Sequence, residues 1–211
     1  MNDKNPIEDL REIRKMMESS SKFLSLSGLS GVFAGLFALV GSWLAYREMN
    51  HMEDLQYWYA VQGRMQDWSD TLNYRLAFIA IAVLIAALSF GILFTWLKAR
   101  KQQKKLWTPL SIRLIISLMV PLGFGGLFII GLYYQGYFAL IAPATLIFYG
   151  LALLNGSKYV HVDIKYLALC EMALGVLALF KLYYGLYFWA VGFGVLHILY
   201  GSIMYIKYDR K

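Results

Sequence analysis

Charged residues are scarce in this chain, at 16% of the sequence against 59% for apolar residues. Between Arg113 and Lys158 there is no Asp, Glu, Lys or Arg at all. An α-helix rises ~1.5 Å per residue, so about 20 apolar residues cross the ~30 Å hydrocarbon core of a bilayer. The uncharged stretch is therefore long enough for two crossings, and its composition excludes a soluble globular fold.

Residues that would support metal, redox or phosphate chemistry are also rare. The one cysteine, Cys170, excludes a disulfide within the chain. The three histidines (His51, His161 and His197) fall in different parts of the expected topology and should not share an ion or a haem. The glycines at 123–126 lie inside an apolar run and do not form a phosphate loop. We expect no metal, no cofactor and no catalytic set.

The net charge of +7 could suggest a nucleic-acid partner, but its distribution favours a membrane. Six basic residues gather in one short connection at 98–113. Lys and Arg are enriched in cytoplasmic loops, which places this connection, 158–165 and 207–211 in the cytoplasm. The first apolar run, near Phe23, has no cleavage site after it and should be retained. We expect a multi-pass protein of the cell inner membrane, with both termini cytoplasmic, lipid as its partner and no nucleic acid.

Two similar units lie about fifty residues apart in the second half of the sequence. Gly125 and Leu127 correspond to Gly175 and Leu177, and the aromatic turn at 132–134 corresponds to that at 182–184. Each unit has two apolar runs joined by that turn, which predicts a helical hairpin. The first apolar run echoes the same pattern. We therefore expect an all-α polytopic membrane protein with six transmembrane helices in three hairpin repeats: 23–97, 112–157 and 163–207.

The segment 1–22 is expected to be a cytoplasmic amphipathic helix ahead of the transmembrane domain, 23–211. Asn5 suits the N-cap and Pro6 the first helical position. Apolar residues then recur at three- and four-residue spacing and share one face. Such a helix could lie on the membrane surface, dock on a partner or cap the bundle.

The first expected membrane helix carries a stripe of small residues. Within it, Gly31 and Gly35 form a GxxxG pair. Small residues let helix backbones approach in lipid, so this helix is expected at the centre of the bundle or at the face of a homo-oligomer. A long polar connection is expected next, at 47–75, where aromatic residues interleave with charges as they do at a membrane interface.

Polar and ionisable side chains inside a bilayer are costly and are candidates for function. Glu171 is expected within the fifth helix and His197 midway along the sixth. Four further polar residues are expected in the same cytoplasmic half of the bundle: Ser27, Ser30, Ser89 and Asn155. These six residues form the candidate polar pocket, which would open inward. The alternative is that Glu171 bonds one helix neighbour and serves packing.

A protease is a further alternative. Gly28-Leu29-Ser30-Gly31 resembles the GxSG pattern of rhomboid intramembrane proteases, and His197 could act as the base for the serine. Rhomboids carry that serine on the fourth helix, whereas here it is on the first. A packing stripe of small residues produces the same pattern, so proteolysis is not favoured.

The unit that runs from Gly175 to Tyr200-Gly201-Ser202-Ile203 resembles a hairpin of the HdeD-like membrane proteins. That resemblance implies a six-helix, three-hairpin protein of the inner membrane, in a group with members implicated in acid resistance. The leader 17–31 is similar to uncharacterised six-span proteins of Bacteroidetes-type bacteria. Neither resemblance assigns a functional residue.

Together these features favour interaction over catalysis. No path of paired charges crosses the expected bundle, and the packing stripe and the amphipathic segment both suit contacts with other chains. We expect a small sensor or accessory subunit that binds another membrane or cytoplasmic protein. The alternative function is a small transporter or channel that uses an inward-facing pocket near Glu171 and His197.

Overall fold

The computed structural model describes residues 27–63, 65–103 and 106–210, whose regular structure is entirely helical. The long helices are α2 (Gly28–Val61), α3 (Met65–Lys101), α4 (Pro109–Tyr134), α5 (Ile141–Gly156) and α6 (Asp163–Leu179). The last helix (Leu182–Asp209) joins η3 (Leu182–Tyr184), α7 (Gly185–Trp189), η4 (Ala190–Leu196), α8 (His197–Met204) and η5 (Tyr205–Asp209). Of these parts, η4 and η5 are π-helical. The amphipathic helix expected at 1–22 lies outside the described residues.

Several of these helices are long and apolar enough to cross a membrane. Within the described ranges there are five: Gly28–Glu53, Ser69–Lys101, Pro109–Tyr134, Phe138–Tyr159 and Leu182–Asp209. The remaining long helix, α6, has 17 residues. The all-α class and the presence of several membrane-length helices, both predicted from the sequence, are confirmed.

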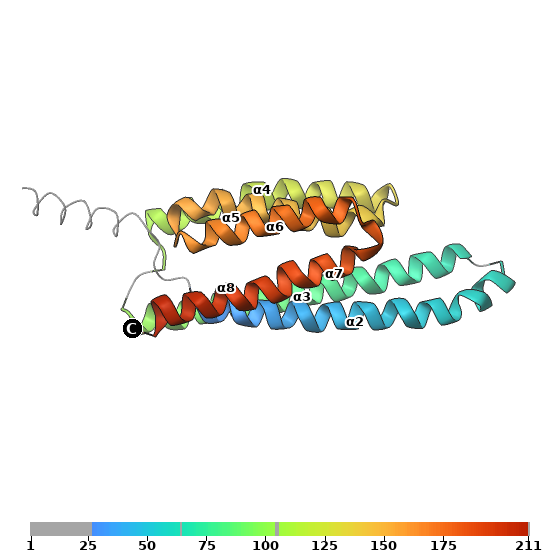
Figure 1. Cartoon of the computed structure of the whole chain (residues 1–211), viewed down its shortest axis with the longest axis horizontal. Coiled ribbons are helices and arrows are strands. Elements are labelled where there is room, and N and C mark those ends of the chain that lie inside the picture. Colours follow the sequence, from blue (N-terminus) through green and yellow to red (C-terminus); the bar gives the residue numbers. More distant parts are fainter. Residues whose placement is uncertain (1–26, 64, 104–105, 211) are drawn as a thin grey trace, which may run out of the picture.

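The helices form two layers, which separate clearly in Figure 1. One layer holds α4, α5 and α6, with α5 packed on both neighbours. The other holds α3, α2 and the last helix, with α2 packed on both neighbours. The two helices of the expected hairpin 163–207 therefore lie in different layers, because α6 packs mainly on α5 and α8 mainly on α2.

Glycines explain the close contact between α2 and the last helix. A Cβ added at Gly31 would lie 3.1 Å from the Cα of Gly201, and one added at Gly35 would lie 2.6 Å from the carbonyl oxygen of Gly194. In the opposite direction, a Cβ at Gly201 would lie 2.6 Å from the backbone nitrogen of Val32. Helix association in lipid depends on such backbone approach. Gly31 and Gly35, the packing pair named from the sequence, therefore lie at the contact between α2 and the last helix.

The described residues of the segment 47–75 are helical apart from a turn at 62–63, which differs from the long polar connection predicted there. α2 continues to Val61, and α3 begins at Met65 after a turn. At ~1.5 Å per residue, the two helices exceed the ~30 Å apolar core by about 20 Å. They project together beyond the other helices as an arm, residues 47–75 (Figure 1). The polar composition that predicted a loop belongs to the adjoining ends of two long helices.

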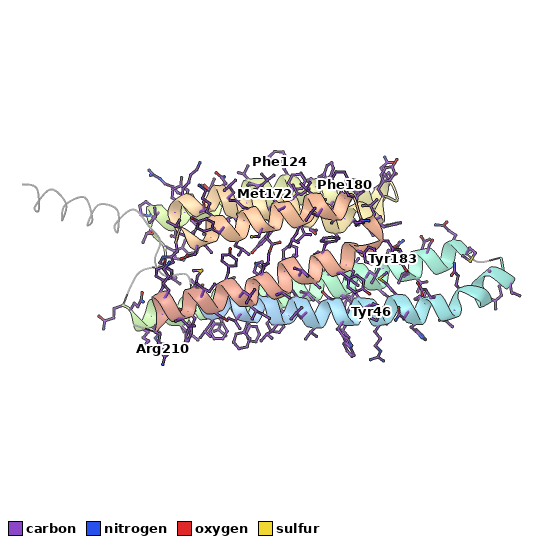
Figure 2. The ribbon with its side chains drawn as sticks, viewed as in Figure 1. Tyr46, Phe124, Met172, Phe180, Tyr183 and Arg210 are labelled. Atoms are coloured by element: carbon purple, nitrogen blue, oxygen red, sulfur yellow. The ribbon has the colours of Figure 1, made fainter. Side chains whose placement is uncertain are left out.

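A group of tyrosines marks the membrane interface at the base of the arm. The ring of Tyr46 on α2 lies 6.4 Å from that of Tyr187, which lies 6.1 Å from that of Tyr184. Figure 2 shows Tyr46 and the neighbouring Tyr183 at a similar level along the bundle. Tyrosine and tryptophan concentrate at membrane–water interfaces. The arm begins directly after Tyr46, so these tyrosines lie at its base.

Asp209 links three helices through hydrogen bonds at the end of the bundle opposite the arm. Its Oδ2 accepts hydrogen bonds from the Gly28 backbone N–H, at 2.8 Å, and from the Ser27 hydroxyl, at 3.2 Å. Its Oδ1 accepts one from Lys98 Nζ on α3, at 2.7 Å. The Lys98 and Asp209 side chains are only 11% and 8% exposed. A carboxylate is also favoured at the N-terminus of α2 by the helix dipole.

Replacing Asp209 with Ala is expected to lower the thermal midpoint in detergent clearly. Removing one partner of a mostly buried ion pair costs about 3–5 kcal/mol, because the remaining charge loses its compensation. Asp70→Ala is a matched control, because Asp70 is exposed and accepts a hydrogen bond from the Gln66 side chain of the same helix. Equal midpoints for the two variants would show that Asp209 is not an anchor.

A second carboxylate, Asp163, ties the start of α6 to the last helix. It lies outside the five membrane-length helices and accepts hydrogen bonds from the Tyr208 hydroxyl, at 2.7 Å, and from Lys207 Nζ, at 3.0 Å. Burial alone would raise the pKa of Asp163, but these hydrogen bonds and the Lys207 charge bring it below its ordinary value. Its contribution to stability is thus complete at neutral pH and is lost only as the pH falls below the range of an ordinary carboxyl group.

Candidate functional site

Glu171 is fully buried at the middle of α6. Its side chain is 0% exposed, and neither carboxylate oxygen makes a hydrogen bond within the described part of the chain. The nearest charge partner is His197, whose Nδ1 lies 3.4 Å from Glu171 Oε1. An unpaired carboxylate in an apolar interior costs several kcal/mol, so this facing imidazole is its compensation. The two ionisable residues named from the sequence are thus brought together, one from each layer.

Hydrogen bonds fix the orientation of the His197 ring. Its Nδ1 lies 3.0 Å from the carbonyl oxygen of Gly192, and its Nε2 lies 2.7 Å from the hydroxyl oxygen of Tyr149 on α5. A carbonyl oxygen can only accept, so Nδ1 carries a hydrogen. In the neutral ring Nε2 accepts from Tyr149, and in the charged ring it donates to the same oxygen. His197 can therefore gain or lose a proton without losing either partner.

The number of protons bound by the Glu171 and His197 side chains determines the net charge of the pair. Besides the hydrogen on Nδ1, one further proton can be bound either by Nε2 or by the Glu171 carboxylate. In the first case the two side chains form an ion pair, and in the second a neutral acid lies beside a neutral imidazole. Both states have no net charge. A further proton leaves one positive charge in the interior, and loss of the proton leaves one negative charge.

The π-helical segment η4 makes room for the carboxylate. A Cβ added at Gly192 would lie 2.5 Å from Glu171 Oε2 and 2.5 Å from Leu146 Cδ2. Only glycine therefore fits opposite Glu171 without displacing these atoms. π-Helical turns within α-helices are frequent at functional sites. Here the wide turn also presents the Gly192 carbonyl oxygen to His197, five residues further on.

Apolar and aromatic side chains enclose these three polar residues, which we call the Glu171 cluster (Tyr149, Glu171 and His197). The ring of Phe193 lies 4.9 Å from that of Tyr149 and stacks on His197 at 5.8 Å. Beneath it, Trp189 lies 4.9 Å from Phe193. Such surroundings have a low dielectric constant, which strengthens interactions between charges. A charge on one residue of the cluster therefore interacts strongly with the other two residues.

The other four residues of the candidate pocket do not join the Glu171 cluster in the described part of the chain. The Ser27 hydroxyl donates to Asp209, and the Ser30 hydroxyl donates to the Ser27 carbonyl oxygen. Asn155 donates from Nδ2 to the Ser117 carbonyl oxygen, at 2.9 Å. Ser89 is exposed on α3. None of these bonds reaches the Glu171 cluster.

Sequence reasoning missed Tyr149 and Gly192. Tyr149-Gly150 resembles Tyr200-Gly201, a similarity that indicates an internal repeat and does not identify the tyrosine as a hydrogen-bonding group. Tyr149 nevertheless supplies the hydroxyl group that completes the site.

No protein-family model matches the chain, and no curated protein or solved structure matches it either.

Proposed function

We propose that this protein is a small proton-responsive sensor or accessory subunit of the inner membrane. The observation that carries the proposal is Glu171, a fully buried carboxyl group that faces His197 of the other layer and has no hydrogen bond to any described residue. Ionisable residues inside membrane proteins are costly and mark proton and ion sites. Histidine is the side chain whose ordinary titration falls between about pH 5 and pH 8.

The proposed topology has six crossings with both termini in the cytoplasm. The 17 residues of α6 extend about 25 Å, which is within the range that spans a bilayer. The basic connections at 98–113 and 158–165 support the orientation. The proposed topology keeps the three pairs of crossings at 23–97, 112–157 and 163–207, and with them the resemblance to the HdeD-like proteins, although the two helices of the last pair lie in different layers.

The cluster couples protonation to the arrangement of the layers. Glu171 and Tyr149 belong to one layer, whereas His197 and Gly192 belong to the other. The ion-paired form attracts the layers to each other across the cluster. Protonation of Glu171 removes that attraction and leaves the imidazole charge facing a neutral acid. A proton that binds one arrangement better shifts the population toward it, and a partner protein would respond to that shift.

Distances between spin labels test this coupling directly. The labels are placed at Leu36 on α2 and Leu169 on α6, both exposed, in a Cys170→Ser background. In lipid nanodiscs, the distance distribution is expected to differ between pH 5.5 and pH 8, and the difference should vanish in Glu171→Gln. Identical distributions at both pH values with Glu171 intact would contradict the proposal. Co-purification that recovers neither a second copy nor another protein would count against an accessory role.

Transport is a second candidate, because the cluster lies where the two layers meet. Many transporters place their site at the interface of two halves and move the halves around it. In that case liposomes containing the protein should show pH-driven proton flux that falls at least about tenfold in Glu171→Gln. An unchanged flux in that variant would remove the residue on which transport depends.

A further inference from the structure

A hollow at the base of the arm combines charges of both signs with apolar surface. It has a volume of about 510 Å³ and is lined by Glu48 on α2 and by Tyr74, Arg75, Phe78 and Ile79 on α3. Glu48 follows Tyr46 by two residues, so the hollow lies at the membrane interface marked by the tyrosines. It shares no residue with the Glu171 cluster and is independent of the proposed function.

The lining changes from polar to apolar along the membrane normal. α3 runs from the tip of the arm into the membrane, so Arg75 lies nearer the tip and Phe78 and Ile79 lie about one turn deeper. The Tyr74 and Phe78 side chains are strongly exposed. A phospholipid at this depth presents its headgroup to the polar part and its acyl chains to the apolar part.

Both charged side chains keep free bonding capacity. Arg75 Nη1 donates to Glu48 Oε2 at 3.0 Å, and the two side chains remain 49% and 31% exposed. This bond uses one of the five N–H groups of the guanidinium, whose planar fork matches phosphate oxygens. The second oxygen of Glu48 can accept a hydrogen bond from an ammonium group, and its charge repels a purely anionic headgroup.

We propose that this hollow binds one zwitterionic aminophospholipid. Its phosphate bonds Arg75, its ammonium group bonds Glu48, and its acyl chains cover Phe78 and Ile79. The pair of opposite charges selects the headgroup, because a headgroup with phosphate alone satisfies Arg75 but not Glu48. Anionic and zwitterionic lipids with the same acyl chains should therefore bind with different affinity.

Native mass spectrometry of the purified full chain tests the proposal, with phosphatidylethanolamine and phosphatidylglycerol of the same acyl chains as probes. The unaltered protein is expected to bind phosphatidylethanolamine about tenfold more tightly, which corresponds to ~1.4 kcal/mol. Arg75→Gln should bind both lipids weakly, and Glu48→Gln should bind both but lose the preference. Arg75→Lys keeps the charge without the fork and should give intermediate binding.

Arg100→Gln is the control, because Arg100 lies on the last turn of α3 at the other end of the helix. It should bind both lipids as the unaltered protein does. The proposal is overturned if the unaltered protein shows no preference, or if Arg75→Gln and Glu48→Gln bind phosphatidylethanolamine as tightly as it does. Thermal midpoints of all variants should agree closely, since both side chains are partly exposed and surface ion pairs contribute little to stability.

Discussion

Replacing Glu171 with Gln is expected to weaken the pH dependence of the thermal midpoint between about pH 5 and pH 8. The prediction rests on the proposed function, in which Glu171 and His197 exchange a proton and the charge buried between the layers changes. An uncompensated buried charge costs about 3–5 kcal/mol, so the midpoint should move by at least about 5 °C across this range. Glutamine has nearly the same volume but does not ionise, and it cannot form the ion pair. Scanning fluorimetry in detergent at closely spaced pH values measures the effect.

Glu48→Gln is the matched control for this prediction. It makes the same chemical change at a partly exposed carboxyl group on the arm and should leave the pH dependence intact. Asp163 should not contribute in this range, because its pKa lies below that of an ordinary carboxyl group. A Glu171→Gln protein that retained the full pH dependence would show that the buried pair does not titrate.

Replacing Gly201 with Ala is expected to lower the thermal midpoint by about 2–12 °C, which corresponds to the ~1–3 kcal/mol cost of overpacking a tight interior. The added Cβ would lie 2.6 Å from the Val32 backbone nitrogen and 2.8 Å from the Gly28 carbonyl oxygen. Both atoms belong to the backbone, so the contact is relieved only if α2 and α8 move apart. The same thermal assay measures the loss.

Gly123→Ala provides the control for the change in helix propensity. Gly123 lies within α4, and a Cβ added there would meet no atom of another element of the described chain within 4 Å. Alanine favours a helix over glycine by about 1 kcal/mol, so this variant should be as stable as the unaltered protein or slightly more so. If Gly201→Ala were equally stable, α2 and α8 could not pack as closely as described.

Apolar composition was sufficient to predict the class of fold, because bilayer thickness limits which chains can cross it. Glu171 and His197 could also be named in advance, since ionisable residues are so few in the apolar runs. Their meeting could not be predicted, because depth in the membrane does not determine the direction in which a residue faces around its helix. Ser89 shows the same limit: it has a suitable depth but lies on an exposed face of α3.

The two layers and the π-helical turn could not be predicted from the sequence for a related reason. A stripe of glycines predicts that a helix packs closely but does not name its neighbour, so the packing of α2 on α8 could not be distinguished from a contact with another chain. A helical period of ~3.6 residues is assumed when a pattern is interpreted, and η4 departs from it. The role of Gly192 opposite Glu171 depends on that departure.

Infrared difference spectroscopy of the full chain in lipid tests most directly whether Glu171 exchanges a proton inside the membrane. Protein with ¹³C-labelled glutamate is compared between acidic and alkaline buffer, with Glu171→Gln as the reference. We expect a protonated carboxyl band that changes with pH in the unaltered protein and is missing from the variant. Difference spectra that are the same for both proteins would mean that the buried carboxyl group keeps one protonation state, and a proton-responsive centre would be contradicted.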